Sequence, residues 1–143
     1  MPMELSIKFV IPSNPRYLSL VRAAVGELAA IHELKPEECR GVMLAVDEAL
    51  ANVIRHAYRG DFERQIEVNC RAFKDRLEFA LLDQGEAPAP DRLAPHPLDD
   101  IALSGRGTHI IRSIMDAVCY EQVPAGNQLR LTKLLAPAEG RNL

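Results

Sequence analysis

Two polar residues, Glu48 and Asn52, lie four positions apart in a predicted helix that spans residues 36–58. Positions four apart in an α-helix are rotated by only about 40°, so both side chains project from one stripe of the surface. A carboxylate can take a proton from a hydroxyl group, and an amide oxygen can bind a Mg²⁺ ion whose other ligands are phosphates and water. Glu and Asn are also common on any solvated helix face, so this pair indicates a site only together with further motifs.

Two glycine-bearing segments supply such motifs. Asp83 ends a predicted strand and precedes Gly85 by two positions. Its carboxylate can accept a hydrogen bond from the amino group of adenine, or it can simply form a turn before a glycine. Gly85 would allow the backbone to approach a base without a Cβ between them. Further on, Gly105 and Gly107 open a predicted helix, and the free N–H groups of a helix start favour phosphate.

In this order, the three motifs resemble the N, G1 and G2 boxes of the GHKL ATPases, the superfamily of gyrase, Hsp90, histidine kinases and MutL. The matching segments are Glu48-x-x-x-Asn52, Asp83-x-Gly85 and Gly105-x-Gly107-Thr108. Within that superfamily the chain is most similar to the anti-sigma-factor serine kinases of the RsbW and SpoIIAB type. This closer similarity covers nearly the whole chain. It is carried by residues 46–58 and 105–116.

The resemblance implies an ATP-dependent serine/threonine-protein kinase that acts as an anti-sigma factor. It would phosphorylate a STAS-domain anti-sigma-factor antagonist, regulate the availability of a sigma factor, use ATP and Mg²⁺, and form a homodimer. Carried over by position, the resemblance implies that Glu48 is the catalytic base, Asn52 the Mg²⁺ ligand, Asp83 the adenine contact and Gly85 the glycine beside the base. It also implies a phosphate loop made of Gly105, Gly107 and Thr108, with Arg106 as a further phosphate contact.

Two other functions stay open. A catalytically silent nucleotide-binding switch could sequester a regulatory partner without any turnover, although such a module has no need of a base at Glu48. A structural domain without a ligand would require all three motifs to be coincidental. A P-loop kinase is excluded because the chain has no Walker A lysine motif. Departures from the family pattern are Glu86 in the G1 segment and a proline-rich stretch after it.

The hydrophobic pattern predicts the elements that must position these motifs. A strand is expected over residues 5–11, a helix after Pro15, the 36–58 helix, a hairpin over 65–82, a mobile lid over 86–104, a helix from 105 and a hairpin over 118–135, with a frayed tail over 136–143. The first helix should bury Leu18, Val21, Val25, Leu28 and Ile31; the second should bury Val42, Val46, Leu50, Val53 and Ala57. This order indicates an α+β two-layer sandwich, a mostly antiparallel sheet covered by helices on one face, in agreement with the Bergerat-type fold of the family.

Composition places the chain in a broad class. Its 143 residues suit a single domain, 1–143. A formal net charge of −3 and the absence of a basic stripe argue against nucleic acid as a direct partner. No stretch approaches the roughly 20 apolar residues that a membrane span requires, and no signal sequence is recognisable, so we expect a cytoplasmic protein. The three cysteines are expected to be buried thiols outside any disulfide framework or metal site.

Overall fold

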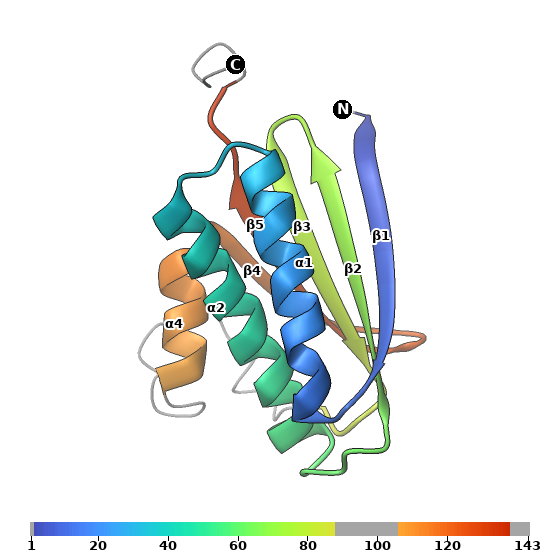
Figure 1. Ribbon diagram of the computed structural model, residues 1–143. Helices are drawn as coiled ribbons and strands as arrows, with labels where there is room; N and C mark the ends of the chain where they lie inside the picture. Colours follow the sequence, from blue (N-terminus) through green and yellow to red (C-terminus); the bar gives the residue numbers. More distant parts are fainter. Residues whose placement is uncertain (1, 88–105, 138–143) are drawn as a thin grey trace.

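The fold has two layers, an antiparallel sheet and a layer of helices on one of its faces (Figure 1). The computed structural model describes residues 2–87 and 106–137, with the side chains of 106–108 left aside. Its strands are β1 (Met3–Pro12), β2 (Gln65–Phe73), β3 (Arg76–Asp83), β4 (Ala117–Val123) and β5 (Gly126–Leu134), arranged in the order β1-β2-β3-β5-β4. Its helices are α1 (Leu18–Ile31), α2 (Pro36–Asn52) and α4 (Arg106–Ile114), with a short 3₁₀ turn before α1. The predicted α+β sandwich is therefore confirmed.

The core lies between the inner face of the sheet and the helices. From the strands it takes the alternating residues Ile66, Val68, Phe79, Leu81 and Leu131; from the helices it takes Val21, Val25, Val42, Val46 and Leu50. The buried stripe predicted for the second helix is confirmed at four positions, and the fifth, Ala57, packs against the core while half-buried. Burial of this stripe fixes the rotation of α2, so its polar stripe faces away from the sheet.

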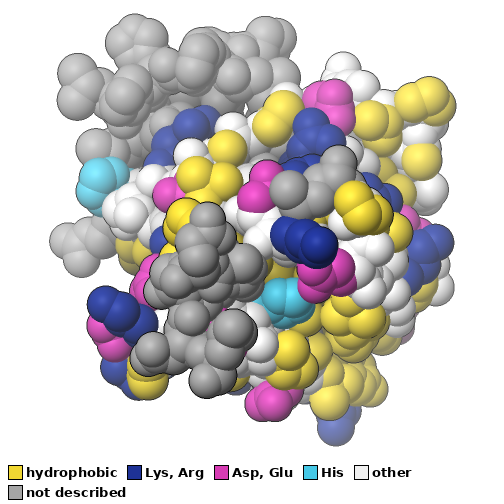
Figure 2. All heavy atoms as spheres, turned by 90° about the horizontal axis from the view of Figure 1, so that it is seen from above, with side chains coloured by type: hydrophobic (Ala, Val, Ile, Leu, Met, Phe, Trp, Pro, Cys, Tyr) yellow, Lys and Arg dark blue, Asp and Glu magenta, His cyan; other side chains and the backbone are white. Residues whose placement is uncertain are grey.

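The helices do not cover the whole sheet, which makes part of the sequence prediction wrong. Ile31, predicted to be buried, is 64% exposed at the end of α1, and Leu5 and Ile7 on β1 are each 38% exposed. For Leu5 and Ile7 the cause is the position of β1 at the sheet edge, beyond the helix layer (Figure 1), whereas Ile31 is the last residue of α1. Hydrophobic side chains gather at the lower right of Figure 2, the side on which β1 and α1 lie in Figure 1.

The outer face of the sheet is largely polar, with Val10 and Leu134 as exposed apolar residues. Lys8 on β1 pairs with Glu67 on β2 at 3.4 Å, and Arg76 pairs with Glu78 along β3 at 2.8 Å. Cys119 also lies on an exposed stretch of β4, so the prediction of three buried thiols is wrong at this position. Cys70 is buried and Cys39 is half-buried.

The second helix does not end where its α-helical hydrogen bonding ends. After Asn52 the chain continues for one wider turn, Val53–Ala57, in which the N–H of Tyr58 donates to the carbonyl of Val53. Left-handed residues at Arg59 and Gly60 then stop the helix, as a glycine there predicts.

The predicted lid lies outside the described residues from 88 onward, and the tail does so from 138. In the part of the chain that the structure describes, no helix is long and apolar enough to cross a membrane.

Candidate functional site

The G1 segment after β3 is joined directly to the turn that follows α2. The N–H of Glu86 donates to the carbonyl of Ala57 at 2.8 Å. The buried hydroxyl of Tyr58 donates to the carbonyl of Gln65 and accepts from the N–H of Gln84. Burial raises the pKa of Tyr58, so this hydroxyl keeps its proton. These bonds hold the segment that carries Asp83 against the end of the helix that carries Asn52.

Gly85 is required at this junction for a reason that the sequence did not reveal. A Cβ at this position would lie 2.3 Å from the carbonyl oxygen of Ala57 and 2.8 Å from the ring of Tyr58. The close approach that only glycine permits is therefore made to the protein's own backbone. Its predicted approach to a base remains a separate expectation.

Helix α4 brings the third motif to the same end of the molecule. A Cβ at Gly41, near the start of α2, would lie 3.4 Å from the side chain of Ile114, which ends α4. Figure 1 shows the two helices side by side and antiparallel. The N-terminus of α4, at Arg106, therefore points toward the end of α2 where Asn52 lies, and its free N–H groups point the same way. Gly105 lies outside the described residues, and of Arg106, Gly107 and Thr108 only the helical backbone is described.

On α2, the two polar residues differ in their surroundings. Glu48 is half-buried, and the described residues form no ion pair with it. Asn52 is also half-buried, but its side-chain oxygen accepts a hydrogen bond of 2.8 Å from the guanidinium of Arg55. The same oxygen would be the ligand of a Mg²⁺ ion. A cation could bind it only after the arginine had moved away.

Asp83 is buried, with 3% of its surface exposed. One of its oxygens, Oδ1, accepts from the N–H of Gly85 at 2.9 Å and from the side-chain amide of Asn127 at 3.0 Å. The first bond is the turn-forming bond of an Asp before a glycine, so Asp83 does have the turn-forming role that the sequence offered as the alternative to an adenine contact. It uses only one oxygen of the carboxylate, and the other remains available as an acceptor.

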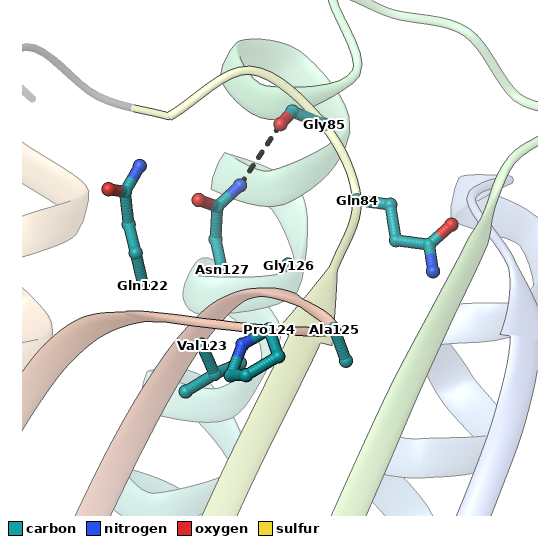
Figure 3. Close-up of a pocket in the computed structure, with 8 residues that line it drawn as sticks. All are labelled: Gln84, Gly85, Gln122, Val123, Pro124, Ala125, Gly126 and Asn127. Atoms are coloured by element: carbon teal, nitrogen blue, oxygen red, sulfur yellow. Dashed lines mark hydrogen bonds between the residues drawn. The ribbon is translucent and has the colours of Figure 1, made fainter.

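Asn127 was not recognised from the sequence as a site residue. It followed Gly126 in a predicted turn, and only the pairing of β5 with β3 places it opposite Asp83. The same pairing continues to Gln122 on β4, so Asp83, Asn127 and Gln122 form a polar row across three strands. A hollow of about 500 Å³ opens at this end of the sheet, between residues 84–85 and the β4–β5 hairpin, and Asn127 and Gln122 line it (Figure 3).

The next row toward the core is apolar. It consists of Leu81, Leu129 and Tyr120, which face one another across the strands β3, β5 and β4. Burial, with a smaller contribution from the charge of Asp83, raises the pKa of Tyr120 above the ordinary tyrosine value. Leu81 is fully buried, so this row backs the site without lining the hollow, and a buried acceptor beside the hollow suits a ligand that carries an amino group.

Asn52 is the described residue that the sequence predicts as a cation ligand. Among the described residues, no three His, Cys, Asp or Glu side chains are close enough to hold a metal ion. Asn52 offers a single neutral oxygen, which suits a Mg²⁺ ion that takes its other ligands from phosphates and water.

Comparison with known proteins agrees with this arrangement. Residues 11–133 match the model of the histidine kinase-like ATPase domain. The chain belongs to this family. It is 30% identical over 139 residues to the serine-protein kinase RsbW of Bacillus pumilus, covering 90% of this chain and 85% of that protein. It is 27% identical over 137 residues to RsbW of Bacillus subtilis, with the same coverage.

The fold has a solved counterpart as well. A crystal structure of the RsbU and RsbW domains of a Mycobacterium tuberculosis protein superposes with a TM-score of 0.65 at 17% identity. The match covers 97% of this chain but only 34% of that one, so the chain spans about a third of that protein's length. The recognition of a GHKL ATPase of the RsbW type is therefore confirmed, and with it the enzyme class, a serine/threonine-protein kinase that uses ATP.

Proposed function

We propose that this chain is an anti-sigma factor that transfers the γ-phosphoryl group of ATP to a serine of a STAS-domain antagonist. The observation that carries the proposal is the convergence of three segments at one end of the molecule. The end of α2, the Asp83–Glu86 segment and the N-terminus of α4 meet there, the first two through the hydrogen bond from Glu86 to Ala57. Phosphoryl transfer needs little more than positioned donors, a cation and an acceptor for the serine proton.

Each residue has one task in this proposal. Asp83 accepts the amino hydrogen of adenine, and the N–H groups at the start of α4, with Gly105, Gly107 and Thr108, receive the phosphates. Asn52 would hold Mg²⁺, which offsets phosphate charge when bound. Arg55 then gives up its hydrogen bond to Asn52 and is free to turn toward an anion. Glu48 takes the proton from the attacking serine hydroxyl.

The test is phosphorylation of a candidate STAS protein, followed by mass spectrometry. Glu48→Ala should still bind Mg-ATP, because the adenine and phosphate contacts lie on other segments. Its phosphotransfer rate should fall by about 10²–10⁴-fold, the usual effect of losing a positioned base. Asp47→Ala is the matched control, since Asp47 is the neighbouring carboxylate on α2 and pairs with Arg22 at 3.1 Å. A wild-type protein that binds ATP but phosphorylates no STAS protein would contradict the kinase mechanism.

One observation favours a second candidate function, a nucleotide-dependent switch without turnover. The side-chain oxygen of Asn52, the proposed Mg²⁺ ligand, already accepts a hydrogen bond from Arg55. If that bond persisted with nucleotide bound, the chain would bind ATP and its partner without transferring phosphate. In that case Glu48→Ala and wild type would bind the partner equally well, and neither would phosphorylate it.

A homodimer acting in the cytoplasm completes the proposal. Support for the dimer comes from β1, a 10-residue strand that pairs with β2 alone among the strands the structure describes. Three of the exposed apolar residues on this strand are Met3, Leu5 and Ile7, and we call them the β1 patch. Antiparallel pairing of two β1 strands about a two-fold axis would cover both features at once.

A further inference from the structure

The side chain of Asn127 has an orientation that its neighbours dictate. Its Nδ2 group lies 3.0 Å from the carbonyl oxygen of Gly85 (Figure 3) and 3.0 Å from Asp83 Oδ1, and both of these atoms are acceptors. The opposite orientation of the amide would place its oxygen against Asp83 Oδ1 and the Gly85 carbonyl oxygen, which cannot donate. The hydrogen-bond partners therefore fix the orientation of the Asn127 amide. Both N–H bonds of Asn127 are used, and its oxygen is the atom that remains.

The remaining oxygen of Asn127 has no hydrogen-bond partner within residues 2–87 and 106–137, although the residue is only 4% exposed. Oδ2 of Asp83 also has no partner among the described residues, because both bonds to that carboxylate end on Oδ1. Asp83 as a residue is 3% exposed. A buried acceptor left unpaired is unfavourable, and buried polar atoms are nearly always paired. Both free atoms can only accept, so the group that satisfies them must donate.

The two acceptors belong to one face of the sheet. Asp83 and Asn127 are directly opposite each other in the β3–β5 pairing, so their side chains project to the same side. That side is the inner face, continuous with the apolar row of Leu81 and Leu129. Asn127 also lines the hollow between residues 84–85 and the β4–β5 hairpin, from which a planar ring would present one edge to the acceptors.

We propose that Asn127 determines the base selectivity of the site, by fixing Asp83 so that only acceptor atoms face a purine carrying an exocyclic amino group. The inference rests on the proposed nucleotide function and deepens it. Asn127 acts through Asp83 and is a positioning residue: it anchors Oδ1, and Oδ2 is left to face the base. An amino group on the purine supplies the missing donors, whereas a purine with hydrogen in its place supplies none.

The test compares two nucleotides that differ only in this amino group, ATP and purine riboside 5′-triphosphate. Wild type should bind ATP about tenfold or more tightly, as expected for hydrogen bonds to a buried carboxylate. In Asn127→Ala, Asp83 loses its anchor, so ATP binding should weaken by about tenfold while binding of the purine analogue changes by less than about threefold. The ratio of the two dissociation constants should therefore approach one.

Two further variants serve as an intermediate case and as a control. Asn127→Ser retains one donor for Asp83 and should give an intermediate ratio; it decides the question if circular dichroism shows that Asn127→Ala does not fold. Gln128→Ala removes an amide from the next position of β5, where the side chain bonds Glu121 at 3.2 Å, and should keep the wild-type ratio.

The outcomes separate this inference from the proposed function. A wild-type protein that binds neither nucleotide would overturn both. If wild type prefers ATP and both Asn127 variants weaken the two nucleotides equally, Asn127 has only a structural role and this inference alone is wrong. An unchanged ATP affinity in the folded variants would have the same meaning.

Discussion

At the scale of single residues, the two oxygens of Asp83 have different tasks. Oδ1 is committed to the Gly85 N–H and the Asn127 amide, and Oδ2 is the atom that would receive a base. This division makes a substitution by asparagine informative, because its oxygen must occupy the Oδ1 position to keep both bonds. Its NH₂ group would then replace Oδ2.

We therefore expect Asp83→Asn to weaken ATP binding by about tenfold or more with little change in fold. The new NH₂ group would face the amino group of adenine, so an acceptor is lost and two donors oppose each other. Titration calorimetry with ATP, together with circular dichroism, checks this. Unchanged affinity in a folded variant would remove Asp83 from the binding site.

A second residue-level prediction concerns Asn52. Asn52→Ala removes the proposed Mg²⁺ ligand and the acceptor of the Arg55 guanidinium. Because that ligand would bind the cation that bridges the phosphates, ATP affinity should lose much of its dependence on Mg²⁺. Titrations with ATP in the presence of Mg²⁺ or of EDTA measure this directly. Glu48→Ala serves as the comparison, since it should retain the wild-type Mg²⁺ dependence, and a similar loss in both variants would argue against a specific role for Asn52.

At the scale of elements, the widened turn Val53–Ala57 connects the chemistry of α2 with the sheet. Its last carbonyl, at Ala57, receives the N–H of Glu86, and the hydroxyl of the following residue, Tyr58, joins Gln65 with Gln84. Single wide turns of this kind are often found at functional sites. Here the turn positions the G1 segment relative to the polar stripe of α2.

Gly85→Ala tests this junction. The added Cβ would lie 2.3 Å from the carbonyl oxygen of Ala57, so the backbone must shift and the bond from Glu86 should weaken. We expect a loss of about 2–4 kcal/mol in the free energy of unfolding, measured with urea. Gly60→Ala is the control: its backbone has φ +79° but open space around it, so it should cost only about 1 kcal/mol of backbone strain. Equal costs for the two variants would show that the junction can relax.

The sequence predicted most elements because their signals are local. Alternating residues predicted β2 and β3, and Pro36 and the stripe from Val42 to Val53 predicted α2. What the sequence could not predict depends on contacts between distant segments. The role of Asn127 requires the β3–β5 register, and the contact of Gly85 with Ala57 requires knowing where the widened turn lies. The exposure of Ile31 was missed for the same reason, since periodicity identifies an apolar face without showing how far its cover extends.

At the scale of the whole molecule, the site and the β1 patch occupy different regions. The end of α2, the segment after β3 and the start of α4 lie at one end of the helix layer, whereas the patch follows the edge of the sheet (Figure 1). The outer face of the sheet is largely polar and carries its own ion pairs. A partner or second copy at the patch would therefore leave the proposed nucleotide site open.

The last prediction is that two copies associate through the β1 patch. Ile7 lies on the helix side of β1 opposite Cys70, while Val10, 55% exposed, lies on the outer face opposite Glu67. Ile7→Lys would place a charge in the proposed interface and should give a monomer, because burying an unpaired charge is strongly unfavourable. Val10→Lys adds the same charge to the same strand on the other face and should leave the dimer intact. Light scattering over a range of concentrations measures both, with wild type expected at twice the monomer mass. A monomeric wild type at high concentration would contradict dimerisation, and a dimer lost only in Val10→Lys would place the interface on the outer face of the sheet.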